Sequence, residues 1–343
     1  MSENNRVLLA MSGGVDSSAA AVLLREQGYE VAGVVLKMSP VHEQTVEDAK
    51  TAASQLGIPL FVKDMTEEFD REVVSYFAAE YRKGRTPNPC VVCNPKLKFK
   101  ALLDTANEEG YGWIATGHYA GLRRENGVTY LTKGENLERD QSYMLCRLGQ
   151  DVLSRLIFPL SHLPKPEVRE IAERAGLSCA KKPDSQEICF IPDNDYARFI
   201  EERLGKSEPG EFISPEGLPC GTHQGIIHYT IGQRKGLGVA LGRPVFVKAI
   251  DPAANRVYLA DAADSFEEEV FLTDLSCTFP DSIQSGMEAE VKIRSRSNPA
   301  KATLTLENGL VRVRFAEPQR APAPGQTAAI YRGDVVLGGG FIE

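Results

Sequence analysis

The stretch RVLLAMSGGVDSS, residues 6–18, decides the fold of the first part of the chain. An apolar run at 6–11 precedes a glycine-rich turn, and residues 17–27 follow at helical spacing up to Gly28. A strand, a turn and a helix in this order point backbone N–H groups and the positive end of a helix dipole at one place, which suits phosphate. Glycine allows close approach of the anion, and Ser17 and Ser18 are positioned to cap the helix.

The same turn lacks two common nucleotide-binding motifs. It has no Gly-Lys-Ser/Thr ending, as ordinary NTPase loops have, and no Gly-x-Gly-x-x-Gly, as dinucleotide sites have. A glycine turn without a ligand is the alternative interpretation. The pattern therefore predicts phosphate binding without defining the substrate.

Further apolar runs at 31–38, 60–63 and 113–117 are typical of buried strands. Helical patterns at 45–56, 69–83 and 100–109 separate them. This alternation predicts an α/β fold, with a parallel sheet and helices on both faces.

The second half of the chain follows a different pattern. Asn126-Gly127 between two short runs predicts a hairpin, and helical patterns follow at 140–148 and 166–175. Short alternating strands then predict a C-terminal antiparallel β-barrel, with segments at 288–295, 302–307, 310–315, 327–332 and 335–342. We expect three domains: a catalytic domain over 1–207, a small central linking domain over 208–270 and the barrel over 271–343.

The composition of the 343 residues is ordinary for a globular protein, with 42% hydrophobic and 25% charged residues. No apolar run is long enough to cross a bilayer, and the first residues do not have the order of a signal peptide. Seven cysteines, an odd number, favour reduced thiols. We therefore expect a cytoplasmic protein with no membrane partner.

The net charge of −8 is unevenly distributed. Residues 257–291 include nine acids and no Lys or Arg, whereas residues 81–103 include six Lys or Arg and no acid. The basic run is either a surface that attracts phosphates or a solvated face, and the sequence favours neither.

Three cysteines are candidates for chemistry. Cys90 and Cys93 form a Cys-x-x-Cys in a proline-rich segment that we expect to be a loop, and neighbouring cations favour low-pKa thiolates there. Cys189 is the third candidate. The other four are best interpreted as small buried residues: Cys146, Cys179, Cys220 and Cys277.

Six motifs in order resemble those of tRNA-specific 2-thiouridylases, which belong to the ATP pyrophosphatase superfamily. They are SGGVDSS at 12–18, CNPKLKF at 93–99, ATGHYA at 115–120, RDQSYML at 139–145, DSQEICFI at 184–191 and GQRKGLG at 232–238. The resemblance implies an enzyme that splits ATP, with Mg²⁺, into AMP and pyrophosphate and installs 2-thiouridine at wobble position 34 of tRNA. Adenylation is chemically apt, because oxide is a very poor leaving group and AMP is a good one.

Carried over by position, Cys93 is the catalytic nucleophile, Cys189 carries a persulfide, and Asp16 positions magnesium and phosphates. The residues implied around ATP are Ala10, Met11, Ser12, Gly13, Gly14, Val15, Asp16, Ser17, Leu36 and Gly117. The residues implied to meet tRNA are Asn88, Pro89, Cys90, His118, Arg139, Asp140, Gln141, Arg294, Ser295 and Gln326. The implied partners are tRNAs for Lys, Glu and Gln and a sulfur-donor or sulfur-carrier protein, such as a cysteine desulfurase relay.

Cys90 departs from the family pattern, because many members have Asp there. Two sulfur routes stay open. In one, Cys189 is loaded as a persulfide and Cys93 forms a disulfide with it. In the other, Cys90, Cys93 and Cys189 hold a 4Fe–4S cluster, which three thiolates favour slightly. Structural zinc is a third option, for which four ligands are not evident.

Two other functions remain as rivals. The first is an enzyme that adds glutamine-derived ammonia to an adenylated carbonyl, although no glutaminase half is evident. The second is a non-catalytic RNA-binding protein, against which the intact turn and the three cysteines argue.

Overall fold

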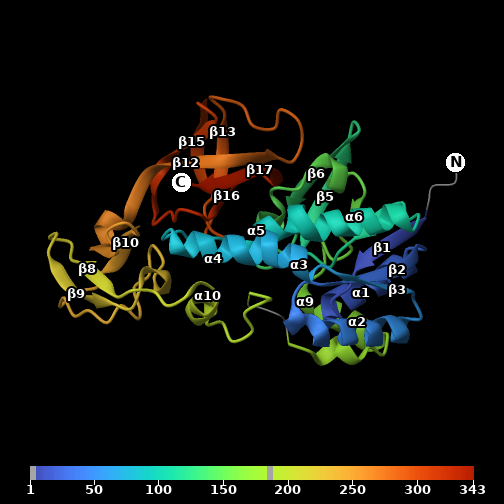
Figure 1. Cartoon of the computed structure of the whole chain (residues 1–343). Helices are drawn as coiled ribbons and strands as arrows, with labels where there is room; N and C mark the ends of the chain where they lie inside the picture. Colours follow the sequence, from blue (N-terminus) through green and yellow to red (C-terminus); the bar gives the residue numbers. More distant parts are fainter. Residues whose placement is uncertain (1–4, 184–187) are drawn as a thin grey trace.

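The computed structural model describes residues 5–183 and 188–343, so residues 184–187 of the motif at 184–191 lie outside the described residues. Figure 1 shows three sheets: a parallel one with helices around it, a small one that includes β8, β9 and β10, and a barrel at the C-terminus.

The first sheet is entirely parallel, in the order β3-β2-β1-β4-β7. Four of its strands confirm the predicted runs, whereas the fifth, only two residues long, was not predictable from periodicity. The strands are β1 (Arg6–Ala10), β2 (Glu30–Lys37), β3 (Leu60–Asp64), β4 (Trp113–Ala115) and β7 (Leu156–Ile157).

Helices cover both faces of this sheet, as predicted. Val7 and Leu9 of β1 pack with α1, α2 and α9, whereas Leu8 between them packs with α6. Successive side chains of a strand point to opposite faces, so one apolar run supplies two cores. The helices are α1 (Val15–Glu26), α2 (Glu43–Leu56), α6 (Phe99–Glu108) and α9 (Lys165–Arg174).

Two helical segments each contain a π-helical turn. The helix predicted at 69–83 is α3 (Thr66–Phe69), a π-helical turn η2 (Asp70–Val74) and α4 (Ser75–Arg82). The prediction of a loop around the Cys-x-x-Cys is wrong, because this segment is helical. It forms α5 (Pro89–Cys93), which continues into a second π-helical turn, η3 (Asn94–Lys98). The Asn88 side chain accepts the N–H of Cys90 at 3.1 Å, and proline at the first helical position suits a helix start.

Several shorter pieces complete the helical inventory. The helix predicted at 140–148 is shorter in the structure, where it is the four-residue α7. Five other short helical turns and one longer helix connect the layers. They are η1 (Pro40–His42), α7 (Ser142–Leu145), α8 (Gln150–Leu153), η4 (Ser178–Lys181), α10 (Tyr196–Leu204), η5 (Ile226–His228) and η6 (Ala262–Ser265).

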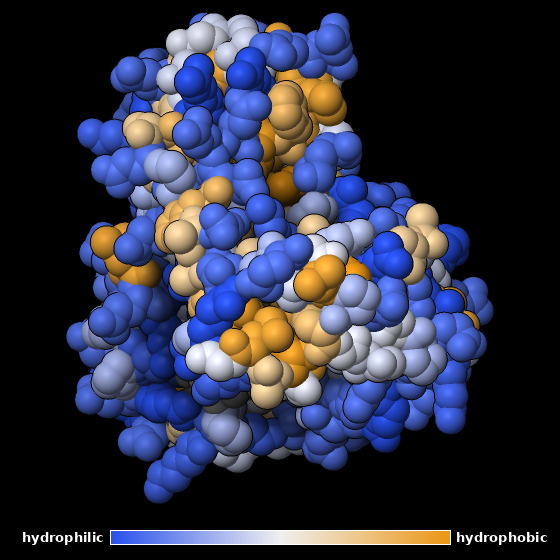
Figure 2. Space-filling view, turned by 90° about the vertical axis from the view of Figure 1, so that its left-hand side faces the viewer, coloured by the Kyte–Doolittle hydropathy of each residue, from blue (hydrophilic) through white to orange (hydrophobic). Residues whose placement is uncertain are grey.

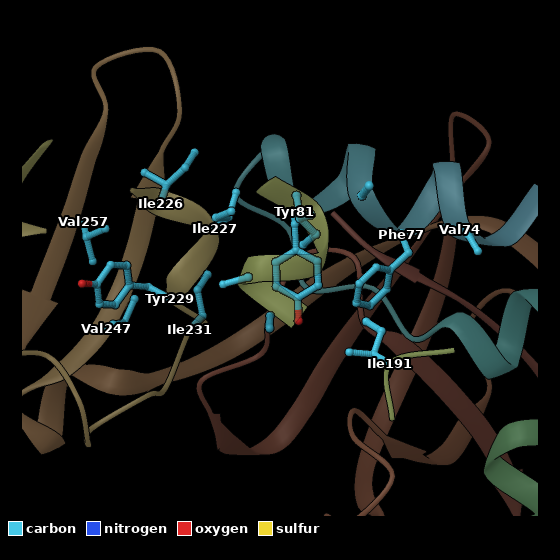
Figure 3. Packing of buried hydrophobic residues seen from close by; sticks show 14 of the residues in the cluster. Val74, Phe77, Tyr81, Ile191, Ile226, Ile227, Tyr229, Ile231, Val247 and Val257 are labelled. Atoms are coloured by element: carbon cyan, nitrogen blue, oxygen red, sulfur yellow. The ribbon is translucent and has the colours of Figure 1, made fainter. Parts of the chain in front are cut away.

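The central sheet has the order β10-β11-β8-β9, and sequence periodicity did not reveal its strands. Figure 3 shows Phe77 and Tyr81 of α4 in one apolar cluster with Ile227 and Tyr229 of this region. The shared cluster fixes the central sheet to the catalytic part. The strands are β8 (Gly210–Ile213), β9 (Pro219–His223), β10 (Phe246–Asp251) and β11 (Arg256–Ala260).

The predicted barrel is confirmed: β12-β15-β14-β13-β16-β17 are antiparallel neighbours, and β12 also pairs with β17 to close the ring. The acid-rich β12 was missed, and the predicted boundary at 270/271 falls within it; the domain limits stay a prediction. The strands are β12 (Phe266–Cys277), β13 (Glu288–Lys292), β14 (Ala300–Glu307), β15 (Leu310–Arg320), β16 (Thr327–Arg332) and β17 (Val335–Ile342).

The predicted hairpin, β5 (Ala120–Glu125) and β6 (Val128–Lys133), is also confirmed. Asn126 and Gly127 have φ of 51° and 78°, as a tight hairpin turn requires. Thr132 of the hairpin pairs with Val335 of β17, so a hairpin from the catalytic part extends the barrel sheet.

The surface on the side of β8 and β9 is largely hydrophilic, and its apolar side chains form separate small groups (Figure 2). In the described parts of the chain, no helix combines the length and the apolar character needed to cross a membrane.

Candidate active site

The glycine-rich turn leaves β1 and enters α1 at the carboxyl edge of the sheet. The helix begins at Val15 with Gly14 as its N-cap residue and has no side-chain cap, so the predicted capping by Ser17 and Ser18 is wrong. The Ser17 hydroxyl instead accepts the N–H of Ser12 at 3.2 Å and donates to the Gly14 carbonyl at 3.3 Å. These bonds hold the turn in a fixed shape at a helix N-terminus, where an anion is favoured.

Two glycines are sterically required around this turn. Gly13 has φ of 68°, and a Cβ there would lie 2.4 Å from backbone and side-chain atoms of Asp48. A Cβ on Gly117, which follows β4, would lie 3.0 Å from the backbone nitrogen of Ser17. The loops after β1 and β4 therefore touch, as expected where parallel strands form a ligand crevice.

Asp16 is held by two partners that sequence patterns did not reveal. The Nζ of Lys165 lies 2.7 and 2.8 Å from its two carboxylate oxygens, and the Tyr119 hydroxyl donates to it at 2.6 Å. The Lys165 side chain is only 8% exposed. A nearly buried ammonium is stable only beside an anion, so this pair fixes the carboxylate beside the loop.

One cavity of about 420 Å³ lies next to the loop, a volume typical of small-molecule sites. Its lining joins the loop to both cysteine segments, although these are far apart in sequence. The predicted residues that line it are Ala10, Met11, Ser12, Asp16, Ser17, Leu36, Pro89, Cys90, Cys93, Gly117, His118, Gln141 and Cys189. Gly13, Gly14 and Val15 complete the loop without lining the cavity.

The thiols are not activated in the way that the basic run suggested. Burial raises the pKa of Cys93 to about 11, and burial with the nearby Cys90 and Cys93 raises the pKa of Cys189 to about 12. Lys98 is the cation that opposes both increases. At neutral pH both groups therefore rest as thiols, and the prediction of a low-pKa thiolate is wrong for Cys93.

The other cations of the run bind elsewhere. Arg82 donates to the carbonyls of Leu204 and Gly205 at 2.6 Å each. Arg85 bonds to the carbonyl of Ile342 and forms an ion pair with Glu80. These side chains tie the catalytic part to its neighbours, so their charge does not reach the thiols.

The fit of a metal cluster can be tested on the three cysteines. Cys90, Cys93 and Cys189 all line the cavity, but among the described residues no three His, Cys, Asp or Glu side chains are grouped as a metal ion needs. In this arrangement the three thiols do not fit a cluster, and we derive no step through one.

His118 is a neutral group in the cavity wall. Burial, with a contribution from the Lys98 charge, lowers the pKa of His118 to about 3. Its Nδ1 lies 2.7 Å from the Thr116 hydroxyl, and its ring stacks on Phe99. The Gln141 side chain, nearby in the lining, accepts the backbone N–H of Tyr119 at 3.0 Å.

Three residues predicted to meet tRNA lie beside the cavity without lining it. Asn88 caps α5, as described above, and Arg139 is exposed. The Asp140 carboxylate accepts the backbone N–H groups of Gly134 and Ser142, so it shapes its own loop.

The three predicted residues of the barrel lie outside the cavity. Arg294 donates to the carbonyls of Ile231 and Ala321 at 2.9 and 2.6 Å, and Gln326 donates to the carbonyl of Thr86 at 3.0 Å. Ser295 is exposed. Arg294 and Gln326 thus join the barrel to the rest of the chain.

Sequence reasoning missed three polar residues at this site: Lys165, His42 and Lys98. Lys165 follows a proline in a helical pattern, and nothing in the neighbouring sequence indicates that its partner is the distant Asp16. His42 and Lys98 line the cavity, and burial lowers the pKa of His42. Lys98 was visible only as one of six cations in the basic run.

Comparison with known proteins gives matches over nearly the whole chain. The matching family models are the tRNA methyl transferase HUP domain (residues 5–193), the tRNA methyl transferase PRC-barrel domain (197–261) and the aminomethyltransferase beta-barrel domain (268–342). The tRNA-specific 2-thiouridylase MnmA of Carboxydothermus hydrogenoformans is 46% identical over 355 residues, covering 98% of this chain and 97% of the relative. The tRNA-specific 2-thiouridylase MnmA 2 of Clostridium botulinum is 44% identical over 352 residues, covering 98% and 99%.

Among solved structures, the NH3-dependent NAD synthetase of Campylobacter jejuni is 17% identical, with a TM-score of 0.33. That likeness covers 54% of this chain and 71% of the synthetase chain.

Proposed function

The chain belongs to the tRNA-specific 2-thiouridylase family, and we propose that the cavity beside the glycine-rich turn performs that family's ATP-dependent thiolation of tRNA. One observation carries the assignment: Ser12, Asp16 and Ser17 of the glycine-rich loop line a single cavity together with Cys93 and Cys189. A phosphate site and two thiols in one cavity suit a reaction that activates an oxygen and replaces it with sulfur. Methyl transfer, which the names of two family models mention, needs neither.

The first step is adenylation of the uracil at position 34. The O2 atom of uracil attacks the α-phosphorus of ATP, and pyrophosphate leaves with the electron pair of the broken P–O bond. The loop N–H groups and the α1 dipole hold the phosphates during this step. Asp16 offers a carboxylate in the cavity lining, which is the oxygen ligand that Mg²⁺ prefers, and Mg²⁺ bound with ATP neutralises phosphate charge.

The second step is sulfur transfer from Cys189. The terminal sulfur of a Cys189 persulfide attacks C2, and AMP leaves with the former carbonyl oxygen. Cys93 then gives up its proton to solvent, and its sulfur attacks the Cys189 sulfur, which breaks the S–S bond, leaves the other sulfur on C2 and forms a Cys93–Cys189 disulfide. Alternatively, Cys93 attacks first and releases hydrosulfide, which attacks C2. Either order consumes one persulfide sulfur and ends with a disulfide that an external thiol must reduce.

The remaining parts of the proposal concern partners and location. A wobble uracil is unpaired in its loop, so extruding it into the cavity costs little. We propose tRNAs for Lys, Glu and Gln as substrates and a sulfur-carrier protein, loaded by a cysteine desulfurase, as the donor in the cytoplasm. The barrel and the residues near the cavity, including Arg294, Ser295 and Gln326, would hold the tRNA.

The decisive test is mass spectrometry of nucleosides from tRNA incubated with protein, ATP, a reducing thiol and a persulfide donor, namely a cysteine desulfurase with free cysteine. We expect a gain of about 16 mass units on uridine 34, together with AMP and pyrophosphate, and loss of the gain in Cys93→Ala. Cys277→Ala, which removes an exposed thiol outside the cavity, is the matched control. No gain with the unaltered protein would refute the proposed function.

The cluster route has its own measurement. Iron and acid-labile sulfide should be near zero in active protein that has been purified anaerobically. Stoichiometric iron that is lost in Cys90→Ser together with activity would instead restore the cluster and remove the persulfide route.

A further inference from the structure

Lys98 occupies a special position among the residues around the cavity. It ends η3, one π-helical turn after Cys93, and its charge and its backbone N–H both oppose the increase in the pKa of Cys93. Among the residues that the structure describes, it is the only Lys or Arg in the cavity lining. Within the same described residues, no ion pair engages its Nζ, and the side chain is only partly buried.

Within the part of the lining that the structure describes, the charge of Lys98 is not compensated. Asp16 is the only carboxylate among these described residues, and Lys165, which does not line the cavity, already neutralises it. Cys93 and Cys189 rest as thiols, and burial keeps His118 neutral. The cavity therefore presents one unbalanced positive charge, where a ligand with several negative charges is expected.

The charge of Lys98 acts on four groups of the cavity lining. They are the two thiols, Cys93 and Cys189, and two histidines, His42 and His118, of which His118 follows the glycine in contact with the loop. In the proposed reaction, C2 of the uracil must meet a sulfur while its oxygen is bonded to the α-phosphorus. The α-phosphate is therefore the phosphate closest to the thiols, whereas the β- and γ-phosphates extend along the loop.

We propose that Lys98 binds the α-phosphate of ATP and of the adenylated uracil, and is a catalytic residue of both steps. This inference rests on the proposed function. When O2 of uracil attacks the α-phosphorus, negative charge increases on the non-bridging oxygens, and the ammonium stabilises it. When sulfur attacks C2 and the C2–O bond breaks, the electron pair leaves on AMP, whose phosphate the same ammonium holds. Lys98 keeps its protons throughout.

The test distinguishes an effect of Lys98 on the α-phosphate from an effect on the Cys93 thiol. All variants therefore carry Cys93→Ala, which removes that thiol. Adenylation precedes sulfur transfer, so Cys93→Ala should still release one pyrophosphate per active site when tRNA and ATP are added. Adding Lys98→Met should slow this burst about 100-fold, the usual effect of removing one transition-state donor, and Lys98→Arg should restore most of it. Lys50→Met, which removes an exposed ammonium from α2, should leave the burst within about twofold.

The rate of the pyrophosphate burst in these variants decides whether Lys98 binds the α-phosphate. A burst in the Lys98→Met, Cys93→Ala protein as fast as in Cys93→Ala alone would overturn the inference, because Lys98 would then act only through the thiol. A slow burst that Lys98→Arg restores, in proteins with equal melting temperatures, supports it. Equal slowing in Lys98→Met and Lys98→Arg would also overturn it, since a phosphate contact tolerates either cation. Absence of any burst in Cys93→Ala would instead contradict the order of steps in the proposed function.

Discussion

The glycine-rich loop and the cysteine-bearing helix both line the same cavity, yet their sequences are informative in different ways. The loop at 12–17 has the form that its residues suggest, because glycine dihedrals and a helix start depend on neighbours in the chain. The electrostatics of Cys93 do not follow from its neighbours in sequence, since Arg82 and Arg85 bind carbonyls and an acid elsewhere. Closeness in sequence predicts backbone shape well and electrostatic environment poorly.

The loop side of the comparison is tested by Gly13→Ala. The new Cβ would collide with Asp48 at 2.4 Å in a left-handed conformation, so we expect a loss of tRNA-dependent pyrophosphate release of more than about 100-fold. Gly28→Ala is the control: its φ is 86°, but no atom lies within 4 Å of the added Cβ. Equal activity of the two variants would show that the close contact is not needed.

The cysteine side is tested by alkylation. A pKa raised from 9.0 to about 11 lowers the thiolate fraction about 100-fold near neutral pH, so Cys93 should react with iodoacetamide about 100-fold more slowly than an ordinary exposed thiol. Its rate should rise with pH up to about pH 11. Site-resolved mass spectrometry measures it, with the exposed Cys90 as internal reference. Faster labelling of Cys93 than of Cys90 at pH 7 would restore the low-pKa interpretation.

A smaller effect is expected on stability below neutral pH. His118 has a pKa of about 3 in the folded protein and an ordinary value near 6.5 when unfolded, so below pH 6.5 the unfolded chain takes up a proton that the folded chain does not. The free energy of unfolding should therefore fall as pH falls from 6.5 toward 3, with a slope of up to about 1.4 kcal/mol per pH unit from this group. Denaturant unfolding of His118→Gln should show a shallower slope, and an unchanged slope would contradict the buried neutral state.

The smallest effect concerns the start of the cysteine helix. Asn88→Ala removes the acceptor for the Cys90 N–H, and loss of such a cap costs about 1 kcal/mol. Chemical denaturation measures it, with Asn298→Ala, an exposed asparagine of the barrel, as control. If both variants lose the same free energy, the cap does not explain why this segment is helical.

Regular elements with long periodic patterns were predictable, and this includes four parallel strands, the barrel and the hairpin at Asn126-Gly127. The two-residue β7, the Glu-rich β12 and the central sheet were not, because pairing with distant strands defines them. At the site, resemblance selected most residues of the lining. It could not reveal that Lys165 neutralises Asp16, or that Arg294 and Gln326 hold backbone carbonyls, since these contacts join segments remote in sequence.

The hairpin of β5 and β6 has a mechanical consequence. Its first strand begins next to Tyr119, whose hydroxyl holds Asp16, and its second strand is bonded to β17 through Thr132 and through the Lys133 N–H to the Asp334 carbonyl. An unbroken run of backbone therefore ties the barrel wall to the nucleotide loop. In the proposed complex with tRNA, this hairpin fixes the distance between the barrel and the reaction centre, and that distance determines which nucleotide reaches the cavity.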